Sequence, residues 1–117
     1  MRFSGVMLGT GDSKVLGEFY AKVLGAPGFQ QDGWYGWAGG TQLMIGNHSD
    51  VKGQSELPQR VMLSFEVDDV VKEFERLRGI GAGVVAEPYE PEGGNGVLLA
   101  TLSDPDGNYL QLAPPWS

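Results

Sequence analysis

The sequence predicts an α+β protein in which one β-α-β-β-β module occurs twice. Two segments with helical spacing of apolar residues each follow an alternating, strand-like segment and an aspartate. The two halves also align with each other: residues 5–12 match residues 62–69, and residues 43–45 match residues 110–112. A repeat of half the chain implies two modules that pack side by side, because each is too small to bury its own sheet face.

The first module is expected within residues 1–46. Residues 2–10 alternate between two faces and predict a strand. Asp12 or Ser13 is expected to cap the helix that follows, because a short side-chain oxygen accepts a hydrogen bond from the free amides of the first turn. Short strands are then expected at residues 29–32, 34–37 and 41–46.

Residues 47–59 are expected to form a linker, because they are polar and aperiodic and contain both glycine and proline. The second module is expected at 60–117, so that the chain is a single domain, 1–117, made of two modules. A strand at 61–67 precedes a helix that we expect Asp68 to cap. Further strands are expected at residues 84–87, 97–102 and 109–113, with a loop at 88–96 that could cover a cleft.

A turn at residues 104–108, Asp-Pro-Asp-Gly-Asn, is expected to join the last two strands in antiparallel pairing. Proline fixes φ, the aspartates bond to nearby amides, and glycine and asparagine tolerate positive φ. On the outgoing strand, Leu110 and Leu112 point to one side, while Tyr109 and Gln111 point to the other. The leucine face is expected to be core.

Composition excludes several classes of protein. The 117 residues carry 8 Lys and Arg against 15 Asp and Glu, a formal net charge of −7, which argues against nucleic acid and anionic membranes as partners. The absence of cysteine excludes disulfides and thiolate metal ligands. No apolar run is long enough to cross a membrane and no signal-peptide core is present, so we expect a cytoplasmic protein.

The strand residues that point away from the helices predict a small-molecule pocket, because they combine adaptable methionines, hydrogen-bonding groups and aromatic rings. A closed core filled by the methionines is the alternative. Two tryptophans three residues apart cannot both face the pocket without a bulge at Gly36, so one is expected on the surface or in a dimer interface. The predicted ligand-binding residues are Met7, Trp34, Trp37, Gln42, Met44, Met62, Ser64, Glu66, Tyr109 and Gln111.

Glu66 is the strongest single candidate for a chemical role. A carboxylate on a face lined by Met62 and Ser64 is costly to bury unless it is paired. It could act as a general base, bind a cationic ligand group, or lie in water at the rim. The single histidine, His48, is expected to be a solvated residue of the linker.

The sequence resembles the vicinal oxygen chelate superfamily, the group of glyoxalases, bleomycin-resistance proteins and extradiol dioxygenases. The resemblance spans nearly the whole chain. It implies the glyoxalase/bleomycin resistance fold, in which paired modules form mixed sheets that curl into a cup, and it implies a homodimer. The motifs that carry it are Asp12 with Phe19-Tyr20 and Val23-Leu24-Gly25, residues 65–70, and the turn at residues 104–108.

The resemblance also places a divalent metal in the family's enzymes, held by His, Gln or Glu on the first and fourth strands of each module. The matching positions in this sequence are Gly5, Met44, Met62 and Gln111. Only Gln111 offers an oxygen, and one neutral amide does not hold a divalent ion. We therefore expect no metal and no cofactor.

Together, the resemblance and the pocket chemistry predict metal-free, non-covalent binding or sequestration of a small aromatic or cationic molecule. This reading favours a binding protein over a metal-dependent lyase. The alternative is a lyase, isomerase or dioxygenase-type enzyme that uses Glu66 as a base or a metal site completed by His48. A regulatory or assembly partner with a vestigial cup is a third possibility.

Overall fold

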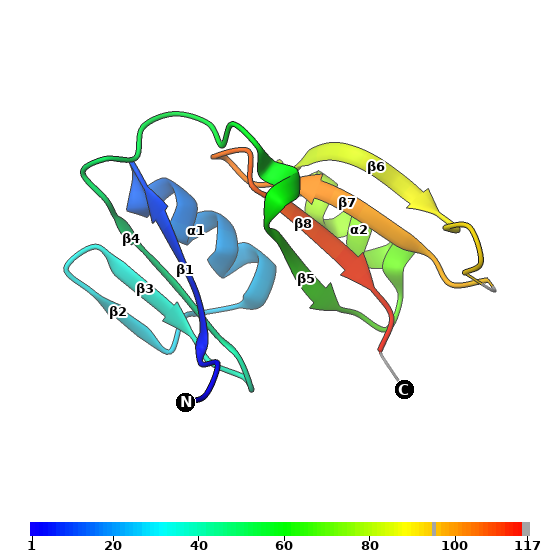
Figure 1. Cartoon of the computed structure of the whole chain (residues 1–117), viewed down its shortest axis with the longest axis horizontal. Helices are drawn as coiled ribbons and strands as arrows, with labels where there is room; N and C mark the ends of the chain where they lie inside the picture. Colours follow the sequence, from blue (N-terminus) through cyan, green and yellow to red (C-terminus); the bar gives the residue numbers. More distant parts are fainter. Residues whose placement is uncertain (95, 116–117) are drawn as a thin grey trace. The chain divides into compact units, whose positions relative to one another are not determined.

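The chain folds into two compact units, Met1–Gly53 and Gln54–Ser117. The structure is a computed structural model that describes residues 1–94 and 96–115. Each unit holds one four-stranded mixed sheet and one α-helix, as Figure 1 shows. The predicted α+β fold with β-α-β-β-β twice is therefore confirmed, and the unit boundary falls inside the segment predicted as a linker.

The first unit places its first strand beside its last. In the sheet order β1-β4-β3-β2, strand β1 pairs parallel with β4, and the other neighbours are antiparallel. This register gives the sheet one face covered by the helix and one open face. The elements are β1 (Gly5–Thr10), α1 (Ser13–Leu24), β2 (Phe29–Gln31), β3 (Trp34–Trp37) and β4 (Gln42–Asn47).

Helix α1 begins after Asp12, whose carboxylate accepts a hydrogen bond from the amide of Val15 at 3.2 Å. The buried side of the helix presents Leu16, Phe19 and Tyr20 to the sheet. The Phe19 and Tyr20 rings meet edge-on, with centroids 5.1 Å apart. These contacts build the core of the first unit on the covered face.

Strands β2 and β3 are joined by the two-residue turn Asp32-Gly33. Both residues have positive φ, 52° and 82°, which is the conformation of the type I′ turn that suits the twist of a hairpin. Asp32 therefore belongs to the turn, and β2 ends at Gln31 rather than at residue 32 as predicted.

The second unit repeats the same topology. Its sheet order is β5-β8-β7-β6, with β5 parallel to β8 and the other neighbours antiparallel. The elements are the 3-10 helix η1 (Pro58–Arg60), β5 (Met62–Glu66), α2 (Val70–Gly79), β6 (Gly83–Tyr89), β7 (Leu99–Ser103) and β8 (Tyr109–Ala113).

Neither α-helix of the described chain is long and apolar enough to cross a membrane.

Strand β6 is longer than the predicted 84–87 and runs through Pro88. A proline is tolerated there because β6 is the edge strand of its sheet, and its pairing with β7 is already irregular at two points. Because β6 ends at Tyr89 and β7 begins at Leu99, the segment between the two strands is 90–98 rather than the predicted 88–96; Asn95, within it, lies outside the described residues.

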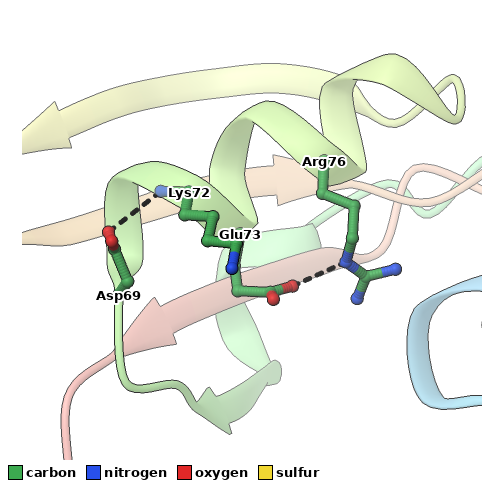
Figure 2. Close-up of polar contacts among 4 residues, drawn as sticks. All are labelled: Asp69, Lys72, Glu73 and Arg76. Carbon is green, nitrogen blue, oxygen red and sulfur yellow. Dashed lines mark hydrogen bonds and ion pairs between the residues drawn. The ribbon is translucent and has the colours of Figure 1, made fainter.

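The residue that caps α2 is Asp69, and the prediction of Asp68 was wrong. The Asp69 carboxylate accepts a hydrogen bond from the amide of Lys72 at 3.0 Å (Figure 2). The helix begins at Val70, and Asp69, directly before it, has the extended backbone of an N-cap. Asp69 is also the residue that aligns with the Asp12 cap of the first unit.

The turn at residues 104–108 forms as predicted. Asp104 is buried, and its carboxylate accepts hydrogen bonds from the amides of Asp106 and Asn108 and from the Asn108 side chain, at 2.9–3.0 Å. The segment before η1 is anchored to this turn, since the Gln54 side chain donates to the Pro105 carbonyl at 2.7 Å. The turn therefore fixes both the β7–β8 hairpin and the start of the second unit.

Candidate functional site

The open face of the first sheet, which we call the first open face, collects side chains that the strand register places side by side. Met7 on β1 pairs with Met44 on β4, and Gly36 on β3 pairs with Met44 from the other side. Phe29 on β2 lies opposite Gly36. The first open face therefore carries two thioethers and an aromatic ring around a bare stretch of backbone.

A pocket of about 260 Å³ opens on this face. It lies where the start of β2, the end of β3 and the start of β4 meet, and every described residue that lines it is uncharged. Among the lining side chains, the Gln42 amide and the indole N–H of Trp37 are the groups that can form hydrogen bonds. The lining residues are Gly28, Phe29, Gly36, Trp37, Ala38, Gln42 and Met44.

The two tryptophans of β3 lie on opposite faces of the sheet. Trp34 is 36% exposed, and its ring lies over Gly46, where an added Cβ would come within 2.6 Å of the ring. The Trp37 ring stacks on Tyr35 on the covered face, with centroids 6.3 Å apart, and its N–H donates to the carbonyl of Gly25 at 2.9 Å. Trp37 borders the pocket, but its ring belongs to the core and is not available to stack on a ligand.

The open face of the second sheet, which we call the second open face, carries the remaining predicted residues. Met62 pairs with Tyr109, and Ser64 with Gln111, so all four point to the same side. Glu66 follows at the end of β5, beside Ala113. This face is more polar than the first open face and contains an ionisable group.

Glu66 lies at the rim of a wide, polar hollow of about 460 Å³ at the N-terminal end of α2. Its side chain is exposed. Asp69 caps the helix there, and Glu73 forms a 2.7 Å ion pair with Arg76, as Figure 2 shows. Asp69 and Glu73 thus have local structural partners, and Val67 is the one apolar residue among the described residues that line the hollow.

The positions that would hold the family's metal do not fit a divalent ion. A Cβ placed on Gly5 would overlap the carbonyl oxygen of Gln42, so the backbone leaves no room for a liganding side chain. Met44 and Met62 offer only thioethers, which do not suit hard divalent cations. Within residues 1–94 and 96–115, no three His, Cys, Asp or Glu side chains gather closely enough to hold a metal.

His48 is an exposed residue, as expected, and its ring is used locally. Its Nδ1 accepts a hydrogen bond from the amide of Asp50 at 3.1 Å, which closes a turn directly after β4. The His48 Cβ packs 3.1 Å from the position that a side chain on Gly9 would take. His48 therefore helps the segment after β4 to fold back onto β1.

The residue that sequence reasoning missed is Phe29. It lines the pocket and is 47% exposed. The signal that could have found it is the Asp32-Gly33 turn, because a two-residue hairpin fixes the register and places Phe29 opposite Gly36. A three-residue strand is otherwise too short to show an alternation.

Comparison with known proteins places this geometry among related folds. A family model for a glyoxalase-like domain matches residues 5–113. The chain is similar to the structure of a glyoxalase-related enzyme from Fulvimarina pelagi, with 22% identity and a TM-score of 0.78 over 98% of this chain and 88% of that one. A search of curated proteins finds no match.

Two further solved structures resemble nearly the whole chain. One is a glyoxalase/bleomycin resistance protein from Albidiferax ferrireducens, with 25% identity and a TM-score of 0.76 over 97% of this chain and 98% of that one. The other is a glyoxalase/bleomycin resistance protein/dioxygenase family enzyme from Burkholderia phytofirmans, with 22% identity and a TM-score of 0.78 over the same shares of the two chains.

Proposed function

The chain belongs to the glyoxalase-like domain family, and from this premise we propose that it binds a small organic molecule non-covalently and without a metal ion. The observation that carries the proposal is the uncharged pocket on the first open face, with Phe29 and Met44 on its walls and the Gln42 amide at its edge. Apolar walls with few hydrogen-bonding groups are typical of small-molecule sites.

The chemistry of the metal positions supports the metal-free part of the proposal. Gly5 supplies no donor, and its surroundings admit no larger side chain. Gln111 supplies a single amide oxygen, whereas hard divalent cations take several oxygen ligands. The ligand is therefore held by apolar contact and hydrogen bonds rather than by coordination.

The second open face, taken by itself, offers polar contacts. Ser64, Tyr109 and Gln111 are hydrogen-bonding groups on one side of the sheet, and Met62 adds an adaptable apolar contact. Glu66 would bind a cationic group of a ligand at the exposed end of this face. We propose these residues as ligand contacts of the second unit, and the pocket on the first open face as the principal ligand site of the first unit.

Tryptophan fluorescence tests the proposal, because Trp34 lies on the first open face. A library of planar neutral and cationic compounds is titrated into the protein, and we expect some of them to quench or shift the emission. Trp37 also borders the pocket, so the Trp34→Phe variant should lose only the part of the signal that comes from Trp34, while equilibrium dialysis still detects binding. If neither fluorescence nor dialysis detects any compound, the proposal is wrong.

The enzymatic alternative depends on Glu66 acting as a base. Its exposed position beside the polar hollow gives it no enclosed apolar surface for a substrate, which favours the binding role. The Glu66→Gln variant separates the two: a binding protein should lose affinity for cationic compounds only, whereas an enzyme of this kind should lose turnover.

The homodimer and the cytoplasmic location stay predictions. Sedimentation equilibrium checks the first, and a mass of two chains would support it. Fractionation of cells that express the tagged chain checks the second, and recovery with membranes would contradict it.

A further inference from the structure

We propose that the pocket on the first open face selects an uncharged aromatic ring system of one or two rings, and that Gly36 and Met44 set the size of ring it accepts. This inference rests on the proposed function and adds the class of ligand. It also narrows the expectation from the sequence, which named an aromatic or cationic molecule.

The charge preference follows from the lining. All the described residues around the pocket are uncharged, so a charged ligand group would lose part of its hydration there without gaining an ionic partner. The net charge of −7 favours cations at the surface in general, but salt screens such attraction beyond about 8 Å at physiological ionic strength. Glu66 and Asp68, by contrast, line the hollow of the second unit, where a cationic group would meet carboxylates.

The shape preference follows from Gly36. Its backbone pairs with Phe29 on one side and with Met44 on the other. A Cβ on Gly36 would come within 2.7 Å of the Met44 sulfur and 3.5 Å of the Phe29 Cβ. Because Gly36 has no side chain, the Met44 thioether can lie over its peptide next to Phe29, and the two side chains form an apolar surface against which a planar ring can pack.

The size of the pocket limits the ligand. Its volume of about 260 Å³ lies below the ~300 Å³ at which pockets for drug-sized ligands begin, and above the ~150 Å³ cavity that holds benzene. One ring or two fused rings therefore fit. The Gln42 amide can donate to or accept from one polar substituent on that ring.

Three compounds that share one ring and differ in charge test the selectivity: benzamide, benzamidinium and benzoate. Each is titrated into the ¹⁵N-labelled protein at ~0.15 M salt, where long-range attraction is screened. We expect benzamide to shift the amides of residues 28–44 and to bind there at least about fivefold more tightly than either ion. Equal or tighter binding of an ion at residues 28–44 would overturn the inference.

Two glycine substitutions test the floor of the pocket. Gly36→Ala should weaken benzamide by about tenfold, because the new methyl pushes the Met44 thioether into the ring's place. Gly39→Ala is the matched control and should leave affinity unchanged, since among the described residues nothing lies within 4 Å of its added Cβ. Equal benzamide affinity in the two variants would contradict the role given to Gly36.

Met44→Ala tests the size limit without adding a side chain to the strand. The variant should favour 2-naphthamide over benzamide compared with the wild type, because removing the thioether widens the pocket. An unchanged ratio of the two affinities overturns the role of Met44 even if Gly36→Ala fails to fold.

The outcomes separate this inference from the proposed function. Binding that maps to residues 62–73, or that prefers an ion at residues 28–44, would contradict the inference. The proposed function, non-covalent binding of a small molecule, would still hold. Binding that occurs only after a divalent metal is added would contradict the proposed function, which requires no metal.

Discussion

In each unit, a helix packs on one face of a sheet, but the two units place their large and small side chains on opposite partners. In the first unit, α1 presents Gly17 directly beneath the ring of Tyr35 on β3. When Asp12 is aligned with Asp69, Gly17 corresponds to Phe74 on α2. Tyr35 pairs with Ile45 as Ala100 pairs with Leu112, so the strand counterpart of Tyr35 is Ala100.

The first unit thus has a small helix residue, Gly17, and a large strand residue, Tyr35. The second unit has a large helix residue, Phe74, and a small strand residue, Ala100. Phe74 and Ala100 are 1% and 0% exposed, so both solutions fill their core. The comparison teaches that these covered faces conserve packed volume rather than residue type, as close-packed interiors require.

The open faces carry no such constraint, and they differ in chemistry. Positions equivalent by register are Met7 with Met44 in the first unit, and Ser64 with Gln111 in the second. The parallel strand pairing therefore places an apolar pair on the open face of the first unit and a polar pair on that of the second. The difference is the physical basis for assigning the apolar ligand surface to the first unit.

Truncation of Phe74, the large residue on α2, should have the largest effect on stability. Phe74→Ala removes a buried ring and leaves a cavity beside a strand residue that is already small, so we expect a loss of about 3–5 kcal/mol in the free energy of unfolding. Urea denaturation measures it. A loss below about 1 kcal/mol would show that the second core can collapse around the gap and would break the size comparison.

The reciprocal change in the first unit should have a smaller cost. An added Cβ on Gly17 would lie 2.5 Å from the Tyr35 ring, and we expect Gly17→Ala to lose about 1–2 kcal/mol of stability after the gain from helix propensity. Thermal unfolding measures it.

Two variants sharpen the reading of Gly17. Gly79→Ala is the helical control, because no described atom lies within 4 Å of its added Cβ, and it should stabilise by up to about 1 kcal/mol. Adding Tyr35→Leu to Gly17→Ala should recover part of the loss. Stabilisation by Gly17→Ala would instead mean that the ring moves away freely.

The helix caps are where the two units are alike, and their removal should have equal, moderate effects. Asp12→Ala and Asp69→Ala each delete a carboxylate that accepts one amide of the first turn, so each should cost about 1 kcal/mol. Asp68→Ala is the neighbouring control and should stay within about 0.5 kcal/mol of the wild type. Chemical denaturation of the three variants checks this, and a larger loss for Asp68→Ala would restore Asp68 as the cap.

The sequence predicted the fold because two independent signals, the aspartate before each helix and the strand alternation, recur in both halves. It misplaced the second cap because two aspartates stand together, and only the backbone at the helix start decides between them. It also ended β6 too early, since the tolerance for Pro88 depends on β6 being an edge strand, which is a property of the assembled sheet.

The candidate site was predicted less completely than the fold. Alternation along single strands placed Met44 and Gln111 on the open faces correctly. It could not find Phe29, and it could not choose between Trp34 and Trp37, because both answers depend on the hairpin register across β2, β3 and β4. Side-chain chemistry is local, whereas the walls of a pocket are assembled from several strands.

Binding measured with and without a chelator tests the central claim most directly. The compound that gives the largest tryptophan fluorescence change is titrated into protein pretreated with EDTA, and then into protein supplied with Zn²⁺, Mn²⁺ or Ni²⁺. We expect the same Kd in every condition, because the pocket on the first open face binds without coordination. Loss of binding after EDTA, restored by one metal ion per chain, would contradict the account.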